Sequence, residues 1–158
     1  LLTQQYGYRV LHHKGQYDVG DRDHAYSNAL PDVSKIINDN PSIKVVIDLH
    51  RDGVAETTRL ATTIDGKPTA QIMFFNGLCR TSARGTIESL PNQYLEQNLA
   101  FSFQMQLAAN RYYPGLTRRI YLKGYRYNMH LCPHTKEEAY NAMKPLADIL
   151  DKVLKKDK

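Results

Sequence analysis

The feature that most constrains the fold is the run KVVIDL at residues 44–49, which ends directly in His50, Arg51 and Asp52. A mostly apolar, β-branched run of this length is typical of a strand covered on both faces, as in a parallel sheet. Open α/β sheets bind their ligands beyond the carboxyl ends of their strands. The run therefore predicts a buried strand whose polar end faces a ligand site.

The rest of the chain alternates between the two kinds of element. Further strands are predicted at residues 8–13, 69–77 and 117–124, and helices at residues 31–40, 94–113 and 135–156. This order favours an α/β fold with a mostly parallel sheet, flanked by helices on both faces, in a single domain.

Two sequence patterns define the longer helices. Leu95, Leu99, Phe103 and Leu107 recur every four residues, which predicts the face that contacts the core. Thr135 is followed three residues later by Glu138, the spacing of a capping box at the start of the last helix.

Charge and composition restrict the classes of partner. The chain has 158 residues and a formal charge of +5, so polyanions such as nucleic acid, anionic lipid or bacterial wall polymers attract it. Its basic residues are scattered, and it has no stacked-aromatic motif and no recognisable reading helix, so we expect no nucleic-acid partner. No run of about 18 apolar residues is present to span a membrane. Cys79 and Cys132 do not form a C-x-x-C motif.

His50 is the first candidate metal ligand. Asp48 lies two residues before it, on the same face of an extended strand, and a ligating histidine usually has such a second-shell acceptor. A hydrogen-bonded structural histidine is the other interpretation. The letters HRD also open the catalytic loop of protein kinases, but that loop needs Asn where this chain has Thr57.

A metal site within these residues would need partners for His50, because catalytic zinc usually has three protein ligands and an open position. His12 and His13 end the first predicted strand, and His24 or Asp23 could supply the third ligand. The spacing matches no local ligand motif, and the alternative is a surface turn.

Several motifs in order resemble the stage II sporulation protein P family of endospore-forming bacteria. They are YGYRVLHHKGQYD, LPDVSKII, NPSIKVVIDLHRDG, TAQIMFFNG, NQYLEQNLAFSFQMQL, YYPGLTRRIYLKGYRYNMHLCP and TKEEAYNAMKPLADIL. The resemblance implies a zinc-dependent N-acetylmuramoyl-L-alanine amidase fold that cuts peptidoglycan between the sugar and the stem peptide. It also implies endopeptidase activity on the peptide cross-links.

The resemblance implies roles for particular residues. His50 matches the zinc-binding histidine of the DLHRD motif. Arg51 is a candidate to bind a stem-peptide carboxylate or stabilise an oxyanion, against a salt bridge with Asp48 or Asp52. Arg126 and Asn128 are candidates to line the substrate groove, against capping of a strand end. Glu137 and Glu138 match the start of the last helix and are not expected to be the catalytic glutamate.

The resemblance also implies two parts that the sequence does not show. A strand before Leu1 would supply the remaining zinc ligands, so no other histidine of residues 1–158 should share a metal with His50. A strand carrying the catalytic glutamate would lie between Pro133 and His134. Its loss would expose the edge of a neighbouring strand. We therefore expect residues to be missing there, with an interrupted backbone, rather than a degenerate enzyme.

The implied mechanism is metal-assisted amide hydrolysis, in which zinc activates water and a glutamate moves its proton to the leaving amine. Residues 1–158 would form the catalytic amidase and endopeptidase domain. The family context implies an upstream membrane anchor, a site between mother cell and forespore, and stage II sporulation protein D as a partner. The alternative function is a non-catalytic peptidoglycan-binding or scaffold module with a degenerate zinc site.

Overall fold

The contacts within the chain divide it into two units, Leu1–Gly7 with Ile47–Lys158, and Tyr8–Val46, each described here by itself. The computed structural model describes residues 1–51, 53–55, 57–83, 85–89, 91–118, 120–123, 129–131 and 135–155. The description covers only the backbone of Arg22, His50, Tyr121, Lys123, Met129, His130 and Leu131.

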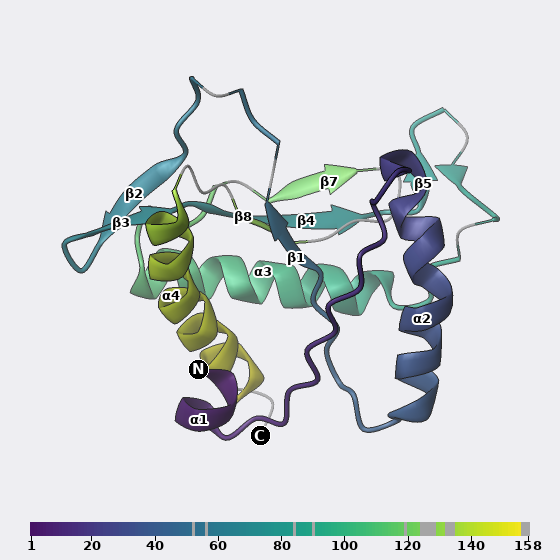
Figure 1. Ribbon diagram of the computed structural model, residues 1–158, viewed down its shortest axis with the longest axis horizontal. Coiled ribbons are helices and arrows are strands. Elements are labelled where there is room, and N and C mark those ends of the chain that lie inside the picture. Colours follow the sequence, from purple (N-terminus) through teal and green to yellow (C-terminus); the bar gives the residue numbers. More distant parts are fainter. Residues whose placement is uncertain are drawn as a thin grey trace. The chain divides into compact units, whose positions relative to one another are not determined.

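The first unit contains a four-stranded mixed sheet (Figure 1). Its strands, in spatial order, are β1 (Leu49–Arg51), β8 (Met129–Leu131), β4 (Ile72–Gly77) and β7 (Tyr121–Lys123). β1 and β8 are parallel, β8 and β4 are antiparallel, and β4 and β7 are parallel. The carboxyl ends of β1 and β8 therefore lie at the same end of the sheet as the first residue of β4.

The prediction of a mostly parallel sheet is wrong. Besides the antiparallel β4–β8 pair, two separate two-stranded antiparallel sheets are present. One pairs β2 (Ala61–Ile64) with β3 (Lys67–Ala70), and the other pairs β5 (Arg80–Thr81) with β6 (Gly85–Thr86). Short turns join both pairs, and a chain that reverses within a few residues can only form antiparallel pairs. An apolar run predicts the burial of a strand but not its direction.

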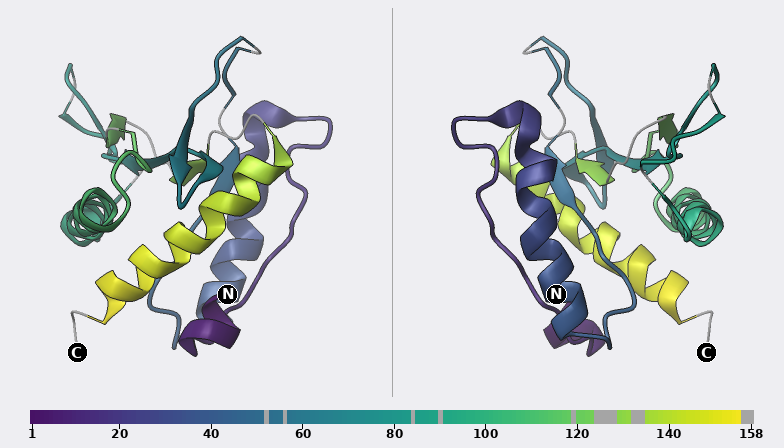
Figure 2. Two further views of the ribbon diagram at one scale, coloured as in Figure 1. Left: turned by 90° about the vertical axis from the view of Figure 1, so that its left-hand side faces the viewer. Right: turned by 90° about the vertical axis from the view of Figure 1, so that its right-hand side faces the viewer.

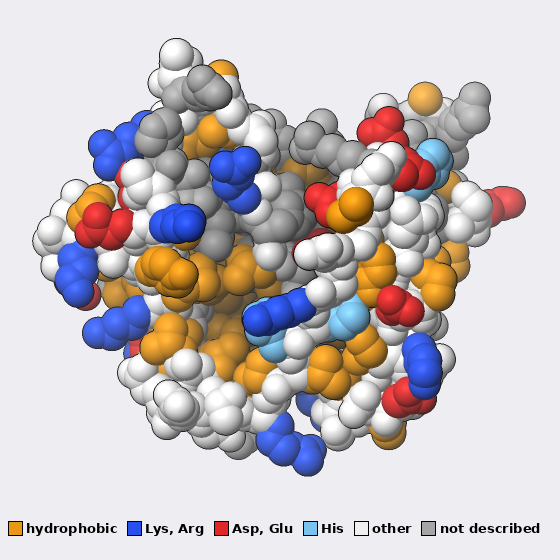
Figure 3. Space-filling model, viewed as in Figure 1, with side chains coloured by type: hydrophobic (Ala, Val, Ile, Leu, Met, Phe, Trp, Pro, Cys, Tyr) orange, Lys and Arg blue, Asp and Glu red, His pale blue; other side chains and the backbone are white. Residues whose placement is uncertain are grey.

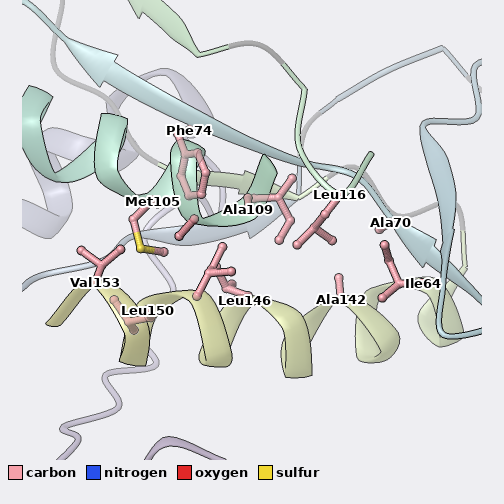
Figure 4. Close-up of a cluster of buried hydrophobic side chains, with 13 residues drawn as sticks. Ile64, Ala70, Phe74, Met105, Ala109, Leu116, Ala142, Leu146, Leu150 and Val153 are labelled. Carbon is pink, nitrogen blue, oxygen red and sulfur yellow. The ribbon is translucent and has the colours of Figure 1, made fainter. Parts of the chain in front are cut away.

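The two long helices of this unit, α3 (Leu95–Tyr112) and α4 (Lys136–Leu154), pack against each other, with α3 on β4 and α4 on β3, and they share one core. The core contains Ile72 and Phe74, which alternate onto one face of β4, together with Met105 of α3 and Leu146 and Leu150 of α4. Figure 4 shows Phe74, Met105, Leu146 and Leu150 between α4 and the strand, and Figure 2 shows α3 end-on with α4 crossing at an angle. The predicted arrangement, with helices on both faces of the sheet, is not found among the described residues of this unit.

The face of α3 that contacts the core differs from the predicted one. Met105, Ala108 and Ala109 are buried, whereas Phe103 is 50% exposed and Leu107 is 67% exposed. Leu95 and Leu99 are half-buried, so the prediction of the core face is wrong at Phe103 and Leu107, which lie on the outer side of the helix.

The amino terminus of α4 confirms the predicted capping box. The backbone N–H of Glu138 donates to Oγ1 of Thr135 at 3.2 Å, and the backbone N–H of Thr135 donates to Oε2 of Glu138 at 3.4 Å. A short helix, α1 (Leu2–Tyr6), contacts α4 and ends at Gly7.

The second unit contains a 3₁₀ turn, η1 (Arg22–His24), and the helix α2 (Ala25–Asp39). α2 ends before Pro41 as predicted, but it begins six residues before Pro31, which lies inside it. Residues 8–13 form no strand, so that prediction is wrong. Tyr17 donates to Oδ2 of Asp32 at 2.6 Å, and this hydrogen bond raises the pKa of Tyr17.

Candidate functional site

The candidate site lies where β1 ends. Of the run KVVIDL, only Leu49 is in the strand, which continues through His50 to Arg51. Val46 is 61% exposed, so the run does not form the strand buried on both faces that we predicted. Asp48 precedes the strand and is exposed. The side chain of His50 lies outside the description, so the expected strand face shared by Asp48 and His50 stays a prediction.

The backbone register brings a second histidine next to His50. His50 is the Cα partner of His130 on β8, and His130 is in turn the partner of Met73 on β4. Adjacent strands lie about 4.8 Å apart, so the two histidine backbones are neighbours. The sequence analysis did not anticipate this pairing, because nothing local in the chain links residues 50 and 130.

The expectation that no other histidine shares a metal with His50 concerns the distances between their ring nitrogens. The side chains of His50 and His130 lie outside the description, so this expectation stays a prediction. The candidate groove residues Arg126 and Asn128, and the expected break between Pro133 and His134, also fall outside the described residues. Arg51, the last residue of β1, is exposed.

The amino-terminal histidines of the alternative metal site make other contacts, and whether any of them meets His50 stays a prediction because the side chain of His50 lies outside the description. Nε2 of His13 lies 2.6 Å from the hydroxyl of Tyr17, and Nδ1 of His24 lies 2.9 Å from Oδ1 of Asp21. These contacts are typical of a surface turn. In the part of the chain that the structure describes, no three His, Cys, Asp or Glu side chains are grouped to hold a metal ion. The described residues alone therefore do not make a zinc site.

An ion pair joins the loop after β1 to the first turn of α4. Nε of Arg59 donates to Oε1 of Glu138 at 2.8 Å, and Nη2 of Arg59 donates to the same oxygen. The side chain of Glu138 is 1% exposed and that of Arg59 is 59% exposed. A buried carboxylate needs such a partner because desolvation disfavours its charge. The two residues are 79 positions apart, so no local sequence signal reveals the pair.

A second polar cluster has a structural role in holding α1 and the end of α3 to α4. The hydroxyls of Tyr6 and Tyr113 donate to the two carboxylate oxygens of Asp148, at 3.3 and 2.9 Å. Nζ of Lys152 lies 3.6 Å from Oδ2 of Asp148. Burial, followed by the hydrogen bond to Asp148, raises the pKa of Tyr113 to about 12.

The surface charge is spread out. Figure 3 shows Lys and Arg side chains at separate places over the face of the molecule rather than in one patch. Within the described residues, no helix combines the length and apolar character needed to span a membrane.

The comparisons with known proteins give one match. The family described as stage II sporulation protein P (SpoIIP) matches residues 1–151 of this chain. No curated protein and no solved structure matches it. The match includes the strand that carries His50, the helix α3 and most of α4. The chain therefore belongs to the stage II sporulation protein P family, a family of sporulation peptidoglycan hydrolases, and its role lies in sporulation, in the engulfment stage.

Proposed function

We propose that this protein cleaves the amide between N-acetylmuramic acid and the stem peptide of peptidoglycan, and also the peptide cross-links. The reaction would thin the septal wall during engulfment, between mother cell and forespore. We further propose that a membrane anchor outside this sequence holds the protein there, with stage II sporulation protein D as its partner. The observation that carries the proposal is the family match across residues 1–151, which includes the strand bearing His50.

The proposal assigns His50 as a zinc ligand, with the remaining ligands and the catalytic glutamate outside the described residues. Zinc bound there would lower the pKa of its water and polarise the amide carbonyl. Arg51 follows His50 directly and is exposed, so its guanidinium is available to a carboxylate or to the developing oxyanion. Arg126 and Asn128 are proposed to line the groove.

Replacement of His50 tests the proposal. The full-length protein should hold about one zinc per chain and release peptides from purified peptidoglycan, as measured by metal analysis and mass spectrometry of the products. His50→Ala should lose both the zinc and the products while keeping the circular dichroism of the folded protein. A zinc-loaded and active His50→Ala protein would exclude the assignment. His24→Ala is the matched control, because His24 is exposed and bonded to Asp21.

The same measurements decide the alternative, a non-catalytic peptidoglycan-binding module. It has one observation in its favour, since the described side chains include no complete ligand group. A module of this kind would sediment with peptidoglycan, contain no stoichiometric zinc, and release no peptide at any enzyme concentration.

A further inference from the structure

The ion pair between Arg59 and Glu138 leaves one edge of the guanidinium open. Both Nε and Nη2 of Arg59 donate to Oε1 of Glu138, which fixes the plane of the guanidinium against the first turn of α4. Nη1 donates to no group among the residues that the structure describes. The side chain is 59% exposed although its partner is 1% exposed. The buried carboxylate thus holds an arginine whose outer N–H groups face solvent.

The strand register places Arg59 beside the candidate site. β1 and β8 end at the same end of the sheet at which β4 begins with Ile72. The preceding residue, Gln71, donates its backbone N–H to the carbonyl of Leu60 at 2.9 Å, and Arg59 directly precedes Leu60 in the chain. β4 lies two strands away from β1, a separation of about 10 Å. Arg59 therefore lies near the start of β4, at the end of the sheet where the strand of His50 also ends.

We propose that Arg59 binds a carboxylate of the stem peptide while the scissile amide lies at His50; this inference rests on the proposed function. A guanidinium presents paired N–H groups that match a carboxylate, and its fixed plane lowers the entropy lost on binding. An extended peptide advances about 3.3–3.6 Å per residue, so the separation of about 10 Å between β1 and the start of β4, near which Arg59 lies, corresponds to about three residues. The carboxylate in question is three to four residues along the stem from the bond that is cut.

The competing role for Arg59 is that of a counter-charge alone. In that role it neutralises Glu138 and stabilises the start of α4, and substrate affinity does not depend on it. Arg59→Lys separates the two roles, because lysine keeps a positive charge near Glu138 but loses the planar pair of donors. Arg59→Gln is the second variant, and thermal unfolding reports whether each variant is folded.

The experiment uses the full-length protein and synthetic muropeptides whose stem ends at the fourth residue, with the terminal carboxylate either free or amidated. We expect the wild-type KM to be about tenfold lower for the free acid, with a kcat that changes less than twofold. Arg59→Lys should raise the KM for the free acid about tenfold and leave the amidated substrate unaffected. Arg111→Lys, an exposed arginine on α3, is the matched control.

Equal KM values for the two substrates in the wild type would overturn the proposal, as would an Arg59→Lys variant with an unchanged preference. Calorimetric binding of the same muropeptides keeps this result distinct from failure of the proposed function. A protein that binds the free acid about tenfold more tightly through Arg59, yet cuts nothing, retains the carboxylate site and loses the hydrolase assignment. A protein that binds neither peptide contradicts both.

Discussion

Asp65 and Gly66 occupy the two central positions of the turn between β2 and β3, and both have positive φ, 49° and 74°. This is the conformation of a type I′ turn, whose twist matches that of the strands it joins. Glycine adopts it without strain, and aspartate tolerates it better than most residues. The dipeptide thus fixes the hairpin that packs against α4.

Gly66→Ala should lower the free energy of unfolding by about 1 kcal/mol, because an L side chain at this φ is strained. A Cβ at Gly66 has no atom within 4 Å, so a clash does not contribute to the loss. Asp65→Gly, the matched control, removes a strained residue and should stay within about 0.5 kcal/mol of the wild type. Urea unfolding measures both. A neutral Gly66→Ala variant would show that the turn has another conformation.

Single residues also show which parts of the structure the sequence could predict. Asp-Gly between two alternating segments is a strong hairpin signal, and its use would have predicted β2 and β3. The capping box at Thr135 and Glu138 was predictable because its interactions span three residues. The bond from Arg59 to Glu138 was not, because it depends on the tertiary fold.

Within α3, apolar residues occur on opposite sides of the helix, so their spacing alone does not identify the core face. Leu99, Phe103 and Leu107 satisfy a helical period, but so do Phe101, Met105 and Ala108, which are the ones packed inward. Which of these two rows of side chains is buried depends on the strand and the helix that pack against α3, and these lie elsewhere in the sequence.

The inward and outward rows of apolar residues on α3 predict different losses of stability on mutation. Met105 is fully buried, so Met105→Ala should cost about 2–5 kcal/mol through lost contacts and a cavity. Phe103 is half exposed, and the higher helix propensity of alanine offsets part of its loss, so Phe103→Ala should cost about 1 kcal/mol or less. Urea unfolding of the two variants ranks them. A larger loss of stability for Phe103→Ala than for Met105→Ala would mean that the helix face predicted from the sequence is the buried one.

The attachment of α3 to α4 through Tyr113 and Asp148 predicts a pH dependence. The pKa of Tyr113 is raised from 10.0 to about 12, first by burial and then by Asp148. A raised pKa in the folded state means that the stabilising effect is complete below pH 10. It is lost as the pH rises towards 12, because the unfolded chain then releases the proton first.

Tyr113→Phe should therefore cost about 1 kcal/mol at pH 8, where the hydrogen bond to Asp148 is intact. The difference from the wild type should narrow between pH 10 and pH 11. Urea unfolding at pH 8, 10 and 11 measures it, with Tyr140→Phe as the control because Tyr140 is 74% exposed. A difference that is constant over this range would show that Tyr113 does not gain its proton affinity from the fold.

For the whole sheet, strand direction is the property that sequence patterns left open. β4 is apolar and buried, as predicted for residues 69–77, but it runs antiparallel to β8. Partner choice depends on segments more than 50 residues apart, and the alternation of side chains is the same in either direction. For the same reason, the sequence did not reveal the pairing of His50 with His130. His50 itself was a candidate because of its place at a strand end.

The net charge of the whole chain gives a last prediction. With 21 Lys and Arg against 16 Asp and Glu, the protein should be attracted to the anionic polymers of the cell wall. Its basic groups are spread over the face in Figure 3, so no single residue should dominate this attraction.

Sedimentation with purified cell walls tests the charge prediction. The bound fraction should fall steeply between 50 and 500 mM salt, because the screening length shortens from about 14 Å to about 4 Å. Walls stripped of anionic polymers should bind less protein at low salt and show a weaker salt dependence. Single exposed substitutions such as Lys67→Gln or Arg80→Gln should each reduce binding only slightly. Salt-independent binding, or loss of binding from one such change, would instead mean that one specific contact dominates wall binding.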